Sequence, residues 1–380
     1  MQHIYLDHAA TTPMHPDVVE SMLPYMTEVF GNPSSIHYFG RKGRHAVDEA
    51  RQSIAESIHA KPNEIVFTSG GTEADNLAIM GTATMMQGKG KHIITSAIEH
   101  HAVLHTCEHL EKQGFTVTYL PVNEAGLVSV KDVKAALTPE TILVTIMFGN
   151  NEVGALQPIK EIGELLKEHQ AIFHTDAVQA YGLVDIDVNH YMVDLLSVSA
   201  HKINGPKGTG FLYMREGKKV APLLFGGEQE KKRRAGTENV AGIIGLQTAA
   251  QLAKQAIDQK YTLYQEFKTT IFSVLKEHDI AFEINGELSK SLPHVVNIYF
   301  PGTNVESMLV NLDLAGIAVS SGSACTAGSI EPSHVLVAMF GKDSDRITSS
   351  IRFSFGLGNT IEDIKTAAFE TAKIVKRLTL

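Results

Sequence analysis

The chain has 380 residues, of which 43% are hydrophobic and 20% are charged, and it carries a formal net charge of −9 at pH 7. This length predicts two domains rather than one simple core, and the composition is that of a folded, water-soluble protein. The acidic balance excludes binding of nucleic acid or anionic membrane by the whole surface, and no apolar run approaches the roughly 18 residues of a membrane span.

Two features of the sequence bear on cellular location, and both favour the cytoplasm. The only cysteines are Cys107 and Cys325, too few for a disulfide framework. The N-terminus lacks the basic region and apolar stretch of a signal peptide. We therefore expect a protein of the reducing cytoplasm, with no membrane partner and no direct nucleic-acid partner.

Strand-like and helix-like segments alternate through the first two-thirds of the chain. Strands are predicted at 64–68, 92–98, 115–122, 141–148, 171–175, 194–198 and 210–214. Helices are predicted between them at 72–86, 101–113, 129–137 and 158–169. This alternation is typical of an α/β domain whose mostly parallel sheet is covered on both faces.

The pattern changes after about residue 254. A long helix is predicted at 255–277, then strands at 280–284, 295–300 and 351–355 and a closing helix at 361–378. The sequence therefore predicts a large domain over residues 15–255 and a smaller α+β domain formed by residues 1–14 and 256–380.

A glycine-rich turn follows the first of these strands. Gly70 and Gly71 allow main-chain amides to approach an anion, and the following helix adds a favourable dipole. Thr72 adds a hydroxyl and is predicted as the N-cap. The turn lacks both the Gly-Lys-Ser/Thr ending of a P-loop and the glycine spacing of a dinucleotide site. It favours a site for a single phosphate ester, and a plain capped helix is the alternative.

Histidines follow the next strand, at His100, His101 and His105. An imidazole at position 100 can stack on a flat ring and exchange protons near neutral pH. The alternative is a metal site, but within this segment only His105 stands at helical spacing from His101. We favour stacking and expect no metal.

Asp176 ends the strand that begins at residue 171. Ligands of open α/β sheets bind at the carboxyl ends of the strands, where this carboxylate could keep a pyridine nitrogen protonated. Gln179, three residues later, could donate to a phenolic oxygen on the same ring. A helix N-cap is the alternative interpretation of Asp176.

Lys202 follows the apolar strand at 194–198 and enters a glycine-rich turn. A lysine at the mouth of a buried strand is costly unless its amine is paired, neutralised or used covalently. A Schiff base with pyridoxal phosphate uses such an amine. A surface lysine in a turn is the alternative, and it is weakened because the other parts of a pyridoxal phosphate site are present in the chain.

The two cysteines stand in contrasting surroundings. Cys325 is surrounded by glycine, serine, alanine and threonine in a loop at about 319–332. Such a loop offers little to pack into a core, so its thiol is predicted to be accessible and nucleophilic. Cys107 lies within a predicted helix and is interpreted as a core residue.

Six segments of the chain together resemble one family. They are residues 6–12, 69–73, 150–154, 174–179, 199–202 and 235–237. The family is that of the pyridoxal-phosphate-dependent cysteine desulfurases, a branch of the aspartate-aminotransferase-like fold (fold type I), and the similarity runs from Tyr5 to about Gly356. Residues 321–325, Ser-Gly-Ser-Ala-Cys, are similar to the branch with a long mobile catalytic loop.

The resemblance implies conversion of L-cysteine to L-alanine, with a persulfide formed on Cys325. Lys202 would hold the cofactor and move the α-proton, and His100 would stack on the ring and act as an acid or base. The other implied cofactor contacts are Gly71, Thr72, Asp176, Gln179, Ser199, His201 and Thr237, the last supplied by the second subunit of a homodimer. Asn151 and Arg352 would bind the substrate carboxylate.

The resemblance also implies a protein sulfur acceptor, either a tRNA-thiolating enzyme or an iron–sulfur scaffold. Two alternatives are a selenocysteine lyase and an aminotransferase-like enzyme, and an aminotransferase would not need Cys325. A non-catalytic binding protein is a third, but it would have no need of Lys202, Asp176, His100 and Cys325 together.

Overall fold

The computed structural model describes residues 3–321 and 332–380. Its main sheet has seven strands in the order β2-β8-β7-β6-β5-β3-β4. The strands are β2 (Ile65–Thr68), β3 (His92–Ser96), β4 (Thr116–Leu120), β5 (Thr141–Thr145), β6 (Ile172–Asp176), β7 (Leu195–Ser199) and β8 (Gly210–Met214). Strand β8 runs antiparallel to β2 and β7, and the other pairings are parallel. The predicted mostly parallel α/β fold is therefore confirmed.

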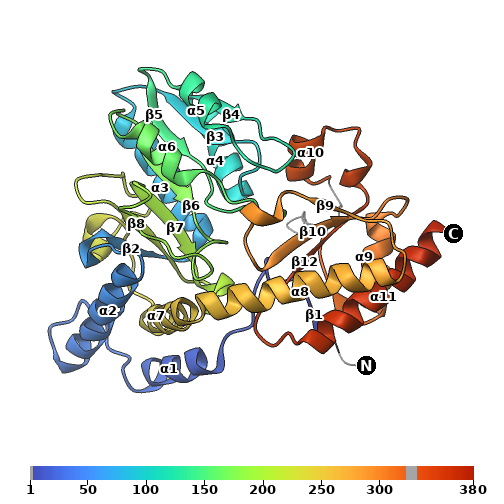
Figure 1. The fold of residues 1–380 in the computed structure, drawn as a ribbon. Helices are drawn as coiled ribbons and strands as arrows, with labels where there is room; N and C mark the ends of the chain where they lie inside the picture. The colour runs from blue at the N-terminus through green and yellow to red at the C-terminus, as the bar shows by residue number, and fades with distance from the viewer. Residues whose placement is uncertain (1–2, 322–331) are drawn as a thin grey trace.

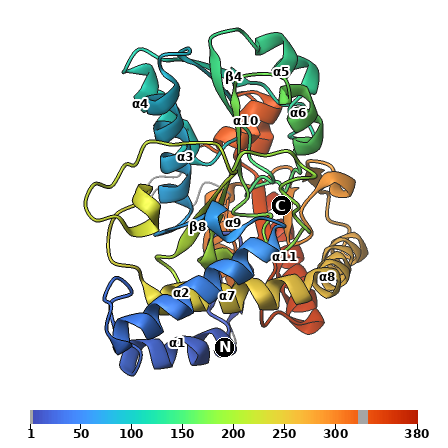
Figure 2. The same ribbon diagram turned by 90° about the vertical axis from the view of Figure 1, so that its left-hand side faces the viewer.

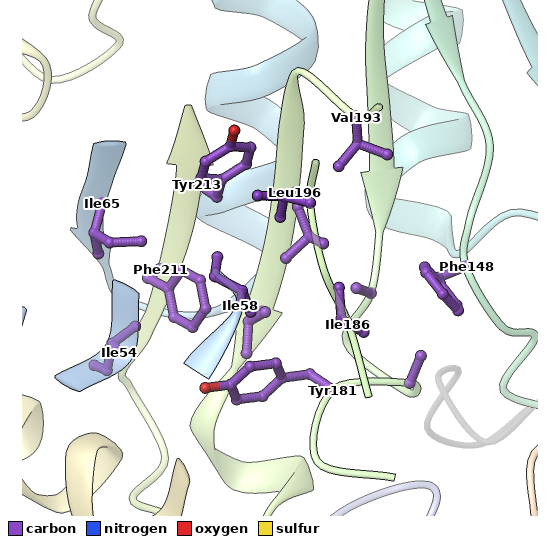
Figure 3. Packing of buried hydrophobic residues seen from close by; sticks show 14 of the residues in the cluster. Ile54, Ile58, Ile65, Phe148, Tyr181, Ile186, Val193, Leu196, Phe211 and Tyr213 are labelled. Carbon is purple, nitrogen blue, oxygen red and sulfur yellow. The ribbon is translucent and has the colours of Figure 1, made fainter. Parts of the chain in front are cut away.

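Helices cover both faces of this sheet, which explains why β5, β6 and β7 are buried along their whole length (Figure 2). Helices α3 (Gly71–Met86) and α4 (His101–Glu111) pack on one face. The other face carries α2 (Tyr38–Ser57), α5 (Val130–Ala136), α6 (Ile159–Leu166) and α7 (Val240–Gln255). On that face Ile54, Ile58, Tyr181 and Phe211 gather into one apolar cluster (Figure 3).

A second part of the molecule lies beside the carboxyl-terminal half of the long helix α8 (Ile257–Glu277), seen in Figure 1. Its antiparallel sheet has the order β12-β10-β9, and β1 pairs with β11 in a short parallel sheet. These strands are β1 (Ile4–Tyr5), β9 (Glu283–Asn285), β10 (Val295–Tyr299), β11 (Ile317–Ala318) and β12 (Ser350–Ser354). The helices here are α9 (Val305–Leu314), α10 (His334–Phe340) and α11 (Ile361–Thr379).

The second part has its own hydrophobic cluster, which includes Phe267 of α8, Ile298 of β10 and Phe353 of β12. The N-terminal strand β1 contributes Ile4 to this cluster, so the two ends of the chain pack together. A division at residues 14/15 and 255/256 remains a prediction. Among the described residues no helix is both long enough and apolar enough to cross a membrane.

The structure also contains helices that the sequence analysis left out, namely α1 (Pro16–Thr27), α2, α7, α9 and α10. Helix α7 contains Gly242 and Gly245, which lower its intrinsic helix propensity. Tertiary packing leaves little room at the second glycine, because an added Cβ would lie 2.6 Å from Sδ of Met22 on α1 and 3.1 Å from Cδ of Pro206. The predicted strand at 280–284 is displaced, since β9 occupies Glu283–Asn285.

Candidate active site

A cavity of about 320 Å³ opens at the carboxyl ends of the parallel strands. Both parts of the chain line it, because Arg352 of β12 reaches the same space as residues of the main sheet. The lining includes Ala9, Ala10, Gly71, Thr72, Asp75, His100, Asn151, Asp176, Gln179, Ser199, His201, Lys202 and Arg352. Of the predicted site residues that the structure describes, all but Thr237 line this cavity, although they are widely separated in the sequence.

Lys202 ends a short 3₁₀ turn, Ala200–Lys202, directly after β7. Its Nζ donates to the carbonyl oxygen of Ala9 at 2.5 Å and to that of Ala10 at 2.8 Å. The N-terminal segment therefore holds the amine at the cavity wall through main-chain acceptors. The amine is therefore paired with main-chain oxygens in the structure, and its use in a Schiff base remains a prediction.

Asp176 is the last residue of β6 and is only 5% exposed. Burial raises the pKa of its carboxyl to about 6, opposed by a hydrogen bond from the Val178 N–H and by the charge of Lys202. The Val178 amide donates to Oδ1 at 2.9 Å. A buried carboxylate at this edge is suited to hold a positively charged ring nitrogen, since each charge would then have a partner.

Asp75 is a cavity residue that the sequence analysis missed. It lies on α3, one helical turn after Gly71, and its buried Oδ1 has no hydrogen-bond partner in the described part of the chain. Burial raises the pKa of Asp75 well above its ordinary value, and the charge of Asp176 raises it further. The signal for it was the four-residue spacing from Gly71, which places both residues on one face of the helix.

Glu99, next to His100, is a second buried carboxyl behind the cavity. Its Oε1 accepts from Ser96 Oγ at 2.6 Å and from the Met147 N–H at 2.9 Å, whereas Oε2 has no partner among the described residues. Burial raises the pKa of Glu99 to about 8. The folded protein therefore keeps this group protonated at pH values at which the unfolded chain has lost the proton.

Replacement of Glu99 by glutamine should make stability less dependent on pH. Because the pKa of Glu99 is about 8 in the folded state against 4.5 ordinarily, native stability falls as the pH rises from about 4.5 to 8. Glu99→Gln cannot ionise at this position. Its free energy of unfolding should therefore rise relative to that of the native chain by on the order of 2–4 kcal/mol between pH 5 and pH 8. Urea denaturation of both proteins at pH 5, 6.5 and 8 measures this gain.

Glu108→Gln, an exposed change on α4 nine residues further along the chain, is the matched control and should show no such trend. A stability difference between Glu99→Gln and the native chain that stays constant over this pH range would contradict the buried, protonated state of Glu99.

The predicted phosphate residues meet at one end of the cavity. Gly71 begins α3, and Thr72, Ser199 and His201 line the same space. An added Cβ at Gly71 would lie 2.7 Å from Cγ2 of Val178, which is itself a lining residue. The prediction of Thr72 as the N-cap is wrong, because Gly70 holds that position with a φ of 148° that only glycine adopts readily.

The two cavity histidines stay neutral at neutral pH. Burial lowers the pKa of His100 to about 4 and that of His201 to about 4, and the nearby charge of Lys202 acts in the same direction. His100 caps α4 by accepting the Ala102 N–H at Nδ1, and His201 Nδ1 lies 3.1 Å from Thr11 Oγ1. No group of histidine, cysteine or acidic side chains in the described part of the chain is arranged to hold a metal.

Arg352 is contributed to the cavity by β12 and is almost fully buried. Its Nη1 donates to the main-chain oxygen of Asn151 at 3.0 Å, and its Nη2 donates to Oδ1 of Asp7 at 2.7 Å. Its buried Nε has no partner among the described residues. Asp7, which the sequence analysis did not assign to the site, therefore helps to hold the guanidinium at the cavity.

Gln179 is fixed by two contacts within the chain. Its Nε2 donates to the carbonyl oxygen of Ala9 at 2.8 Å, and its Oε1 lies 3.1 Å from Nε2 of His294. His294 lies immediately before β10 in the other part of the molecule, and no local signal in the sequence pointed to it. The predicted contact of Gln179 with a cofactor remains a prediction.

Two predicted site residues are not among those that line the described cavity. Thr237 is exposed and does not line the cavity of its own chain. Cys325 and most of its loop lie outside the described residues. Cys107 is fully buried on α4, as predicted, and burial raises the pKa of its thiol to about 12.

The residues around the cavity fit pyridoxal phosphate. Its aldehyde needs an amine, its ring nitrogen an acidic partner, and its phosphate a cluster of donors. Lys202, Asp176 and the N-terminal end of α3 supply these three features around one space. Asp75, whose Oδ1 has no hydrogen-bond partner among the described residues, adds a further polar group to the lining of that space.

Comparison with known proteins agrees with this fit. The family model for aminotransferase class-V matches residues 4–366. Among solved structures, a NifS-like protein superposes with a TM-score of 0.92 at 33% identity, covering 99% of this chain and 100% of that one. SspA in complex with cysteine superposes with a TM-score of 0.81 at 38% identity, covering 93% and 98%. The fold and the site thus define a pyridoxal-phosphate-dependent enzyme of aminotransferase class V.

Curated relatives of similar sequence indicate one family within this class of enzymes. The putative cysteine desulfurase IscS 1 of Bacillus subtilis is 65% identical over 379 residues, which is 100% of both chains. The cysteine desulfurase IscS of Methanosarcina thermophila is 51% identical, over 99% of this chain and 92% of that one. The chain belongs to the cysteine desulfurase family.

Proposed function

We propose that this cysteine desulfurase converts L-cysteine to L-alanine and receives the sulfur as a persulfide on Cys325. The thiolate of Cys325 attacks the substrate sulfur, a sulfur–sulfur bond forms, and the bond between that sulfur and the substrate β-carbon breaks. The electron pair of the broken bond stays on the carbon, which takes up a proton to give alanine. The convergence of Lys202, Asp176 and Arg352 on one cavity is the observation that carries this proposal.

We assign the proton transfers and the substrate contacts to residues of the cavity. When bound, pyridoxal phosphate supplies an electron sink for the substrate α-carbon. The Nζ of Lys202 removes the α-proton, and neutral His100 exchanges protons beside it. Arg352 and Asn151 hold the substrate carboxylate, a task for which a guanidinium is suited because its N–H groups match two carboxylate oxygens.

The cofactor contacts follow from the same arrangement. Asp176 holds the ring nitrogen, and Gln179 donates to the phenolic oxygen. The phosphate is held by Gly71, Thr72, Ser199 and His201, together with Thr237 of a second subunit.

Exposed apolar side chains support a homodimer. Phe30, Ile36 and Phe225 are 69%, 91% and 86% exposed, and Tyr38 and Phe39 are also exposed. Phe30 and Phe39 stack with ring centroids 5.4 Å apart. Such exposed aromatic and aliphatic groups are typical of a surface that another protein covers. A second copy of the chain is the partner we propose, because Thr237 of each subunit would then complete the cavity of the other.

The persulfide passes to a protein acceptor, either an iron–sulfur scaffold or a tRNA-thiolating enzyme. The names of the relatives, cysteine desulfurase IscS, agree with a sulfur-delivering role for those proteins. The free thiol of Cys325 that this reaction needs suits a reducing compartment such as the cytoplasm, in which it is not consumed by disulfide formation.

Incubation with L-cysteine should add one sulfur atom to Cys325. The purified enzyme, free of reductant, is treated with L-cysteine, and peptide masses and released alanine are measured. Cys107 is the control within the same chain and should stay unmodified, because it is fully buried and its thiol pKa is raised to about 12. Alanine without sulfur on Cys325 would indicate a lyase, and the absence of alanine would overturn the desulfurase proposal.

A further inference from the structure

His294 is a buried imidazole with one polar ring contact. It stands immediately before β10 and is only 5% exposed. Its main-chain oxygen accepts the Phe355 N–H at 2.8 Å, which ties it to the end of β12. Ring atom Nε2 lies 3.1 Å from Oε1 of Gln179, and Nδ1 has no hydrogen-bond partner within the described residues. The ring is thus oriented toward the amide of Gln179.

The orientation of the Gln179 amide follows from its other neighbour. The carbonyl oxygen of Ala9 lies 2.8 Å from the atom assigned as Nε2. A rotation of the amide by 180° would place two carbonyl-type oxygens at that distance without a proton between them, which is repulsive. The nitrogen therefore faces Ala9 and the oxygen faces His294.

This orientation requires a proton on Nε2 of His294. Burial lowers the pKa of His294 well below its ordinary value, and the positive charges of Lys268, Arg352 and Lys202 act in the same direction. A neutral imidazole carries one N–H, and only the tautomer with that proton on Nε2 can donate to Oε1 of Gln179.

The amide nitrogen of Gln179 carries two N–H groups, and Ala9 accepts one of them. The described residues offer no further hydrogen-bond acceptor to this nitrogen, and Gln179 lines the cavity. The second N–H is therefore the donor that Gln179 can offer to a ligand there. If the amide turned over, an oxygen acceptor would replace that donor.

We propose that His294 is a positioning residue, which holds the amide of Gln179 so that its nitrogen serves the phenolic oxygen of pyridoxal phosphate. The inference rests on the proposed cofactor contact of Gln179. A donor to the phenolic oxygen stabilises the ionised form and lowers the pH at which the visible absorption of the bound cofactor changes. Loss of either His294 or Gln179 should therefore move that pH midpoint upward.

The test compares His294→Phe, which keeps a ring but has no donor, with His294→Gln, whose amide nitrogen can replace Nε2–H. Each holoenzyme is titrated by absorbance, and the cofactor dissociation constant is measured after removal and re-addition of the cofactor. We expect His294→Phe to raise the midpoint and to weaken cofactor binding about three- to tenfold, the effect of one hydrogen bond. His294→Gln should restore both values toward those of the native enzyme.

The variant Gln179→Leu distinguishes a failure of the proposed cofactor contact from a failure of the proposed role of His294. If Gln179→Leu leaves the midpoint unchanged, the proposed cofactor contact of Gln179 is wrong. If Gln179→Leu raises the midpoint but His294→Phe does not, the positioning role is wrong. The double variant should match Gln179→Leu alone, and an added effect of His294→Phe in that background would also overturn the inference. Thermal unfolding of the cofactor-free variants shows whether a general loss of structure accounts for the shifts.

Discussion

Replacement of Lys202 by alanine should lower alanine formation from L-cysteine by at least about 10³-fold, within the range that a positioned proton-transfer group contributes. The native Nζ lies at the cavity wall, held by the carbonyl oxygens of Ala9 and Ala10. No other lysine lines this cavity among the described residues, so a neighbouring amine cannot take its place. Alanine release under saturating L-cysteine measures the loss, and the visible absorption of the purified variant shows whether cofactor is still bound.

Lys207→Ala is the matched control, because Lys207 is exposed and lies only five residues further along the same segment. It should keep native activity and the native spectrum. If Lys202→Ala kept more than about a tenth of native activity, a general-base role for this lysine would be untenable, since such a role contributes about 10²-fold or more.

Replacement of Arg352 by lysine should lower kcat/KM for L-cysteine about 100-fold. A hydrogen bond to a charged group contributes about 1.5–3 kcal/mol, and lysine cannot reproduce the two parallel bonds that a guanidinium makes to a carboxylate. In the structure the guanidinium already bridges the Asn151 carbonyl and Asp7, so its direction is set before substrate arrives. Because the contact persists from bound substrate to transition state, the effect should fall mainly on KM.

Steady-state kinetics with L-cysteine separate the two parameters. Arg377→Lys is the control, since Arg377 on α11 is exposed and its Nη2 contacts only Asn311 at 2.5 Å among the described residues. A fall in kcat at unchanged KM would contradict the binding of the substrate carboxylate by Arg352. It would indicate an effect on the chemical step instead.

Much of the main sheet and its site could be predicted because the signals are local. Runs of apolar residues separated by helical patterns indicated a mostly parallel sheet, and the carboxyl ends of parallel strands meet at one edge. Asp176 and Lys202 each end such a strand or follow it directly, so their convergence was predictable without knowledge of strand order. The glycine turn before α3 was predictable for the same reason, although its N-cap was assigned to Thr72 instead of Gly70.

Other parts of the fold have weak local signals. Helix α7 is rich in glycine and alanine because α1 and the segment before β8 approach it closely. The glycines lower helix propensity while tertiary packing compensates for it, so the pattern of α7 did not indicate a helix.

By itself the sequence determined the class of fold and the family and predicted a set of site residues, because each depends on short segments. Only the tertiary structure decided which side chains from distant parts of the sequence contact the predicted site residues. Asp7 pairs with Arg352 across 345 residues of chain, and His294 contacts Gln179 across 115. Burial, which keeps Glu99 protonated and His100 neutral, likewise arises only when helices and strands pack. The periodicity of apolar residues along a chain indicates which face of a helix or strand is apolar. It does not indicate which side chain from a distant part of the sequence will pack against that face.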